Sequence, residues 1–102
     1  MKEGFLQSRG IYYRHNDFEP SRKTLLFIHG LSGSSSAWLP FEKTFEQKYN
    51  LVSFDLRGHG KSKRWEKYED YDISKFSEDI AELLEYLRVE KCVLISHSFG
   101  TL

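Results

Sequence analysis

The chain has 102 residues, of which 39% are hydrophobic and 16% aromatic, so we expect one domain (residues 1–102) with a packed core. Its 15 lysines and arginines balance 15 aspartates and glutamates, which leaves no electrostatic attraction to nucleic acid or to an anionic membrane. Cys92 is the single cysteine, which excludes an internal disulfide, and its apolar surroundings in the sequence predict a buried, unreactive thiol.

The first part of the chain has β character around residues 11–13, followed by a turn at residues 17–21. The N-terminus lacks the apolar stretch of a signal peptide. The longest apolar runs, residues 25–28 and 92–95, are far too short to cross a bilayer. We therefore expect a cytoplasmic protein with neither a membrane nor a nucleic acid as partner.

A short apolar run at residues 23–28 ends at His29-Gly30 and predicts a buried strand. Ser36 is then expected to cap a helix in which Pro40 is tolerated in the first turn. Four aromatic residues follow at near-helical spacing: Trp38, Phe41, Phe45 and Tyr49. Residues 51–55 predict the next strand, and residues 57–71 a polar loop.

Asp72 is expected to cap a second helix with one apolar stripe, formed by Ile73, Phe76, Ile80, Leu83, Leu84 and Leu87. Its other side is expected to be polar and to carry Lys75, Glu78, Asp79, Glu82 and Glu85. Residues 91–95 predict the last strand. Alternating strands and helices, with strands that are apolar runs, favour an α/β fold whose mostly parallel sheet is buried on both faces.

In a parallel sheet the loops that follow the strands emerge at one edge, and ligands bind there. The corresponding loops in this sequence are residues 29–33, 55–60 and 96–100, and all are rich in glycine, histidine or serine. Three such loops at one edge indicate a functional site more strongly than any one of them does.

Ser98 follows the last predicted strand, with the small residues Ser96 and Gly100 two positions away on either side. A nucleophile at the apex of a strained strand-to-helix turn needs small neighbours at these positions. The N-terminus of the following helix would favour negative charge near the serine oxygen. The alternative is that Ser98 only caps that helix, but the other two loops favour a nucleophile.

Acyl transfer needs backbone N–H donors for the developing oxyanion. Phe99, directly after the predicted nucleophile, is one candidate, and Leu31 in the loop after the first parallel strand is the other. Gly30 allows the backbone to turn inward, and we expect His29 to position this loop rather than transfer a proton. The alternative is that His29 and Gly30 simply terminate a strand.

The loop after the second parallel strand is expected to be scaffold for the oxyanion loop rather than part of the catalytic machinery. Gly58 and Gly60 make a tight turn around His59. Asp55 and Arg57 are expected to tie this loop together by hydrogen bonds.

Other site chemistries do not fit the sequence, so we expect no cofactor and no metal. Residues 30–36 lack the lysine of a phosphate-binding P-loop, and residues 58–60 lack the third glycine of a dinucleotide fingerprint. The histidines show no metal-binding spacing. A basic cluster interleaved with Trp65 and Tyr68 is read as a solvated loop in preference to an anion site: Arg57, Lys61, Lys63, Arg64 and Lys67.

From residue 23 to its end, the sequence resembles the N-terminal half of an α/β-hydrolase-fold enzyme. The resemblance is carried by His29-Gly30, by Asp55-x-Arg57-Gly58-His59-Gly60-x-Ser62 and by Ser96-His97-Ser98-Phe99-Gly100. It implies that Ser98 is the nucleophile of a serine hydrolase that cleaves a small carboxylic ester or related acyl substrate through an acyl-enzyme. It also implies that Leu31 and Phe99 donate the oxyanion N–H groups.

Within the resembled family, dehalogenases and epoxide hydrolases carry aspartate at the apex of this turn. With a serine at this position, the sequence resembles the esterase, thioesterase, carbon–carbon hydrolase and aminopeptidase branches. Ser96 departs from the commonest family residue, glycine, and Thr101 from a frequent small residue.

The family's triad runs Ser, then Asp or Glu, then His along the chain, and the sequence after Ser98 contains neither an acid nor a histidine. We do not expect His29 or His97 to replace the missing base. The strand ending at residue 95, which is central in the family's sheet, is expected to form an exposed apolar edge. We therefore expect a truncated domain that lacks the C-terminal half of the fold and is inactive alone. The alternative function is a non-catalytic binding half of a split hydrolase.

Overall fold

The structure is a computed structural model and describes residues 1–97. Its elements are β1 (Lys2–Leu6), β2 (Ile11–His15), β3 (Thr24–Ile28), the 3₁₀ helix η1 (Ser35–Trp38), α1 (Leu39–Phe45), β4 (Asn50–Phe54), the 3₁₀ helix η2 (Tyr68–Tyr71), α2 (Ile73–Tyr86) and β5 (Val93–Ser96). The predicted order of strand, helix, strand, helix, strand is confirmed from β3 to β5. A hairpin precedes it, and only its second strand was clear from the sequence.

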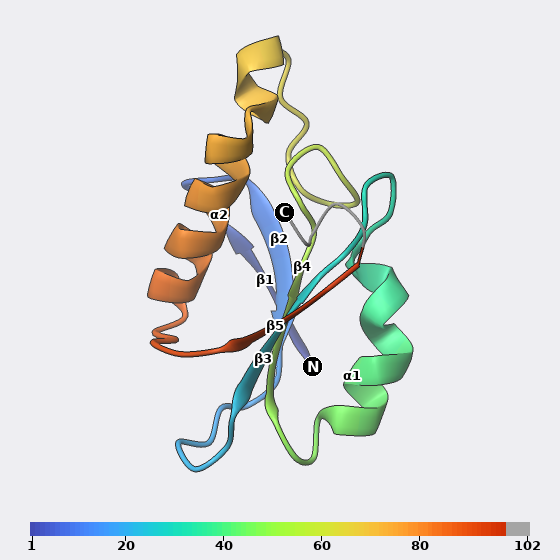
Figure 1. Cartoon of the computed structure of the whole chain (residues 1–102), viewed down its shortest axis with the longest axis vertical. Helices are drawn as coiled ribbons and strands as arrows, with labels where there is room; N and C mark the ends of the chain where they lie inside the picture. Colours follow the sequence, from blue (N-terminus) through green and yellow to red (C-terminus); the bar gives the residue numbers. More distant parts are fainter. Residues whose placement is uncertain (98–102) are drawn as a thin grey trace.

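The strands form one sheet in the order β1-β2-β4-β3-β5 (Figure 1). β3 lies between β4 and β5 and is parallel to both, with Leu26 opposite Val52 on one side and Leu94 on the other. The hairpin is antiparallel, and β2 also pairs antiparallel with β4, so the sheet is mixed. The parallel part brings the carboxyl ends of β3, β4 and β5 to one edge.

Side chains of the central strands alternate between two separate cores, one on each face of the sheet. The core against α2 contains Leu26, Ile28, Val52, Phe54, Phe76 and Leu83. The core beside η1 and α1 contains Leu25, Phe27, Leu51 and Trp38. Figure 1 shows α1 and α2 on opposite sides of the sheet. Burial on both faces explains why these strands read as continuous apolar runs.

The first helical segment differs in detail from its prediction. Ser34, and not Ser36, caps η1, because the Ser34 side chain accepts a hydrogen bond from the Ser36 backbone N–H. Pro40 lies in the first turn of α1, as predicted. α1 ends at Phe45, so Tyr49 lies in the loop before β4 and packs there against the Phe45 ring.

α2 begins directly after Asp72, as predicted, although the Asp72 carboxylate accepts the Ser74 hydroxyl instead of capping a backbone N–H. Most of the predicted apolar stripe packs on the sheet, but Ile73 is 50% exposed. The prediction that Asp79 lies on the polar side is wrong. Asp79 is 2% exposed and forms ion pairs with two arginines. No helix within residues 1–97 is long and apolar enough to cross a membrane.

β5 is an edge of the sheet within the described residues, where it pairs with β3 alone. Val93 and Leu94 are 50% and 59% exposed, which confirms the apolar edge expected at this strand. Cys92, directly before β5, is half-buried, and this burial raises the pKa of its thiol. A raised pKa lowers the thiolate fraction, in agreement with the predicted unreactive cysteine.

Candidate active site

The two loops that follow β3 and β4, residues 29–35 and 55–62, are joined by hydrogen bonds at three points. The backbone N–H of Leu56 donates to the His29 ring over 2.9 Å, and the backbone N–H of Ser32 donates to the His59 ring over 3.2 Å. The backbone N–H of Ser35 donates to the Asp55 carboxylate over 2.6 Å. The first two of the predicted site loops therefore come together at the carboxyl edge of the sheet.

His29 is 1% exposed and uses both ring nitrogens. Its Nε2 accepts the Leu56 N–H, so the proton is on Nδ1, which donates to the Gly30 carbonyl over 2.7 Å. Burial lowers the pKa of His29, which favours the neutral ring that these bonds require. A ring held in this way favours positioning of the backbone over proton transfer.

His59 makes the reciprocal connection. Its Nε2 accepts the Ser32 N–H, and its Nδ1 donates to the Arg57 carbonyl over 3.0 Å. The rings of His59 and His29 lie 5.2 Å apart. Each histidine therefore binds the backbone of its own loop and the backbone of the other loop. We call these two rings the histidine clasp.

Acidification is expected to destabilise the fold through His29. Because its pKa is lower in the folded chain than the unfolded value of about 6.5, the unfolded state binds more protons between these two values. The contribution of the neutral ring is complete above the unfolded pKa and is lost as the pH falls through the folded pKa. Urea unfolding between about pH 8 and about pH 5 measures this slope.

His29→Phe removes this titration and should flatten the pH dependence, whereas His97→Gln changes an exposed histidine and should leave it intact. The ring nitrogen chemical shifts of His29 at neutral pH provide a direct check of the Nδ1–H tautomer. A tautomer with the proton on Nε2, or a pH slope that persists in His29→Phe, would contradict this account of the clasp.

Asp55 fixes the turn of the 55–62 loop. Its Oδ1 accepts from Ser35 and its Oδ2 from the Lys61 backbone N–H over 2.8 Å, while its carbonyl accepts the Ser62 hydroxyl over 2.6 Å. Gly60 has φ +50°, and a Cβ there would lie 2.3 Å from Asp55 Oδ2. Glycine is therefore required at this position by both conformation and space.

Arg57 connects the 55–62 loop to α2 and to the segment before it. No hydrogen bond joins it to the Asp55 side chain in the described part of the chain; Arg57 instead donates to Asp79 of α2, from Nε over 2.7 Å and from Nη2 over 2.8 Å. Its Nη1 donates to the Asp70 carbonyl over 2.7 Å. Gly58, with φ +77°, lets the chain turn beside this pair. Asp79 is thus a supporting residue that sequence reasoning missed.

The basic residues of this loop do not form one solvated cluster. Arg57 is 3% exposed, and its guanidinium lies 4.8 Å from the centre of the Trp65 ring. The Lys63 ammonium lies 3.9 Å from the same ring, and Lys61 lies 4.8 Å from the ring of Tyr12. Of these ring contacts, only that of Lys61 joins the loop to another element, β2. The predicted solvated loop is wrong for Arg57, which is buried, but Lys61, Lys63, Arg64 and Lys67 are exposed as predicted.

Leu31 lies in a turn closed by a 3.0 Å hydrogen bond from the Gly33 N–H to the Gly30 carbonyl. Its side chain is 59% exposed. The Leu31 backbone N–H donates to no acceptor within residues 1–97, although its neighbour Ser32 is bound to the clasp. An N–H that is free while the backbone around it is held suits an oxyanion donor.

The third predicted loop begins at the same edge. Ser96, the last residue of β5, is half-buried opposite Ile28, and the following His97 N–H donates to the Ile28 carbonyl over 3.1 Å. The chain therefore leaves β5 directly beside the start of the 29–35 loop. Ser98, Phe99 and Gly100 lie outside the described residues.

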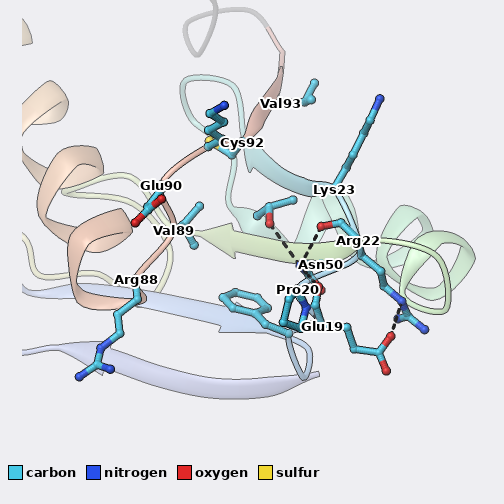
Figure 2. Close-up of a pocket in the computed structure, with 13 residues that line it drawn as sticks. Glu19, Pro20, Arg22, Lys23, Asn50, Arg88, Val89, Glu90, Cys92 and Val93 are labelled. Carbon is cyan, nitrogen blue, oxygen red and sulfur yellow. Dashed lines mark hydrogen bonds and ion pairs between the residues drawn. The ribbon is translucent and has the colours of Figure 1, made fainter.

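A cavity of about 620 Å³ lies at the opposite edge, where β3, β4 and β5 begin (Figure 2). Among the described residues that line it, no buried side-chain nitrogen or oxygen lacks a hydrogen-bond partner. The Asn50 amide donates to the Glu19 and Arg22 carbonyls, and Arg22 is paired with the Glu19 carboxylate at 2.7 Å. In Figure 2, the Lys23 and Arg88 side chains extend away from each other. Within residues 1–97, no group of three or more histidine, cysteine, aspartate or glutamate residues is arranged to hold a metal ion.

The fold and this edge define an α/β protein whose candidate site is built on the loops after parallel strands. A sequence model of one family, described as the alpha/beta hydrolase fold, matches residues 23–102. The chain belongs to this family, and it forms part of that fold.

Several relatives of this chain are named as hydrolases. It is 33% identical over 82 residues to epoxide hydrolase 4 of Mus musculus, which covers 80% of this chain and 23% of the relative. It is 32% identical over 91 residues to the putative carbamate hydrolase RutD of Stutzerimonas stutzeri, and this match covers 89% of this chain and 34% of the relative. The solved structure of the thioesterase domain from the curacin biosynthetic pathway superposes on this chain with a TM-score of 0.78 at 31% identity. The match covers 98% of this chain and 38% of that domain's chain. The chain therefore spans about a quarter to a third of these curated relatives.

Proposed function

We propose that this chain carries the nucleophile and oxyanion part of a serine hydrolase that acts on a carboxylic ester or a related acyl compound such as a thioester or carbamate. The observation that carries the proposal is the Leu31 N–H, which has no acceptor within residues 1–97 and lies between Gly30 and Ser32, two residues that the histidine clasp binds, near the point where the chain leaves β5. Backbone donors held in this way stabilise charge that develops on a carbonyl oxygen.

In the proposed reaction, the Ser98 Oγ forms a bond to the acyl carbon and loses its proton to a base. The carbonyl oxygen becomes an oxyanion, which accepts hydrogen bonds from the N–H groups of Leu31 and Phe99. The oxyanion then collapses, the leaving group departs with a proton, and water hydrolyses the acyl-enzyme. His29 and His59 have both ring nitrogens engaged by backbone groups, so neither of them is this base.

Epoxide hydrolysis is the second candidate, because a relative at 33% identity is named an epoxide hydrolase. The chemistry of Ser98 argues against it. A carboxylate that opens an epoxide forms an ester, which water then hydrolyses. A serine oxygen would form an ether, which water does not cleave under the same conditions. Ser98 therefore favours acyl substrates.

A fluorophosphonate probe tests the proposal. We expect the probe to label Ser98 in a full-length protein that contains this chain, and Ser98→Ala to abolish the labelling. Ser8→Ala, which changes an exposed serine in the β1–β2 turn, is the matched control and should label normally. Labelling that persists in Ser98→Ala would overturn the proposed nucleophile.

The isolated chain provides a second measurement. We expect residues 1–102 to hydrolyse esters no faster than their Ser98→Ala variant, because no acidic residue or histidine follows Ser98 within them, where the family's triad order places both. Turnover that depends on Ser98 in this chain would show that the base lies within it, contrary to the proposal.

A further inference from the structure

A buried ion pair lies on the face of the sheet that packs against α1. Arg14 of β2 is 8% exposed and Glu42 of α1 is 2% exposed. The guanidinium donates to both carboxylate oxygens, from Nη2 over 2.6 Å and from Nε over 3.2 Å. Ser53 of β4, opposite Arg14 in the sheet, also donates to the Glu42 carboxylate, over 2.6 Å.

The guanidinium of Arg14 also holds the far end of the 29–35 loop. Its Nη1 donates to the Ser35 hydroxyl over 2.9 Å and its Nη2 to the Ser35 carbonyl over 2.8 Å. The Ser35 N–H is bound to Asp55. All three polar groups of Ser35, which is itself 1% exposed, are therefore fixed. The loop is held at one end by the histidine clasp and at the other by Arg14.

Burying two charges costs roughly what their attraction returns, so replacing a buried ion pair with apolar residues is often neutral for stability. The surrounding core on this face is apolar and contains Leu25, Phe27 and Leu51. What an apolar pair does not provide is the planar fork of an arginine, which binds a carboxylate and a neighbouring backbone carbonyl at the same time.

We propose that Arg14, oriented by Glu42, is a positioning residue that fixes the 29–35 loop through Ser35 and so sets the place of the Leu31 N–H. This inference rests on the proposed function. Arg14 lies outside residues 23–102, the part of the chain that matches the family. A displacement of about 1 Å in a group that binds the reacting atoms costs on the order of a hundredfold in rate.

Amide hydrogen exchange in the 102-residue chain tests the positioning without requiring catalysis. In the double variant Arg14→Met with Glu42→Leu, which keeps apolar volume in place of the pair, we expect the Ser32 and Ser35 amides to exchange at least about tenfold faster. The thermal midpoint should fall, because the buried Ser53 hydroxyl and Ser35 carbonyl lose their partners, but the sheet amides of Leu26 and Val52 should accelerate less than the two loop amides. Arg14→Lys keeps the charge but loses the fork, and should accelerate the same two loop amides.

Arg9→Met is the matched control, because Arg9 pairs with Glu78 and Asp79 on α2 and, within residues 1–97, has no hydrogen bond or ion pair to the 29–35 loop. It should leave the Ser32 and Ser35 amides unchanged. Unchanged exchange of these amides in a folded double variant would overturn the proposal. If the double variant does not fold, the same two rates in Arg14→Lys decide the question.

Fluorophosphonate labelling in the full-length protein separates this inference from the proposed function. A labelling rate that falls about tenfold to a hundredfold in Arg14→Lys supports both. No labelling of the unaltered protein would refute the function, while the exchange rates would still establish or refute the role of Arg14 in holding the loop.

Discussion

Replacing Asp79 with asparagine is expected to remove about 3–5 kcal/mol from the free energy of unfolding. The Asp79 carboxylate accepts from Arg57 through two hydrogen bonds and from Arg9 over 2.8 Å. Asparagine keeps the shape of this side chain and withdraws its charge, which leaves Arg57, at 3% exposure, without its counter-ion. The free energy of unfolding of small domains is only about 5–15 kcal/mol, so this substitution should remove a large fraction of it.

Urea unfolding of two separate variants, Asp79→Asn and the control Glu82→Gln, measures this loss of stability. Glu82 lies on the same helix and 3.5 Å from the Arg9 guanidinium, but its side chain is 47% exposed. Removing that charge should cost less than about 1 kcal/mol, because solvent screens an exposed pair. Equal stability losses in the two variants would show that the Asp79 pair contributes no more than a surface pair.

The contrast between Asp79 and its helix neighbours shows where sequence reasoning reached its limit. The apolar spacing of α2 correctly predicted that Phe76 and Leu83 face the sheet. The same spacing placed Asp79 on the polar side, because helical periodicity assigns a charged residue to solvent. Its burial depends on Arg57, a residue 22 positions away whose direction follows from the course of a loop. Local pattern contains no information about that contact.

The candidate site was predictable to a similar depth. Parallel strands predicted that the loops after β3 and β4 meet at one edge, and they do. The clasp itself depends on ring tautomers and on hydrogen bonds between residues 27 positions apart. Arg14 gave no signal, since an arginine in a strand predicts an exposed side chain. Its burial follows from the antiparallel pairing that sets β2 beside β4 and places Arg14 opposite Ser53.

Asp55→Asn is expected to cost about 2–3 kcal/mol of unfolding free energy and to separate the two site loops. Each carboxylate oxygen of Asp55 accepts one backbone N–H, from Ser35 and from Lys61. An asparagine side chain offers only one oxygen, which can accept from one of these two N–H groups. Its NH₂ group then faces the other N–H group, and these two facing donors have no acceptor. Because Asp55 is only 2% exposed, water does not reach this position to replace the lost acceptor.

The same substitution at Asp17, an exposed partner of Lys2, is the matched control and should leave stability unchanged. Hydrogen exchange distinguishes the loop from the sheet, because the Ser35 and Lys61 amides are expected to lose protection in Asp55→Asn before the amides of β3 and β4 do. If those two amides stay protected while the chain loses stability overall, Asp55 stabilises the fold without holding the loops together. In that case, the histidine clasp and the contacts between Ser35 and Arg14 would hold the backbone around Leu31 in place, and Asp55 would not contribute.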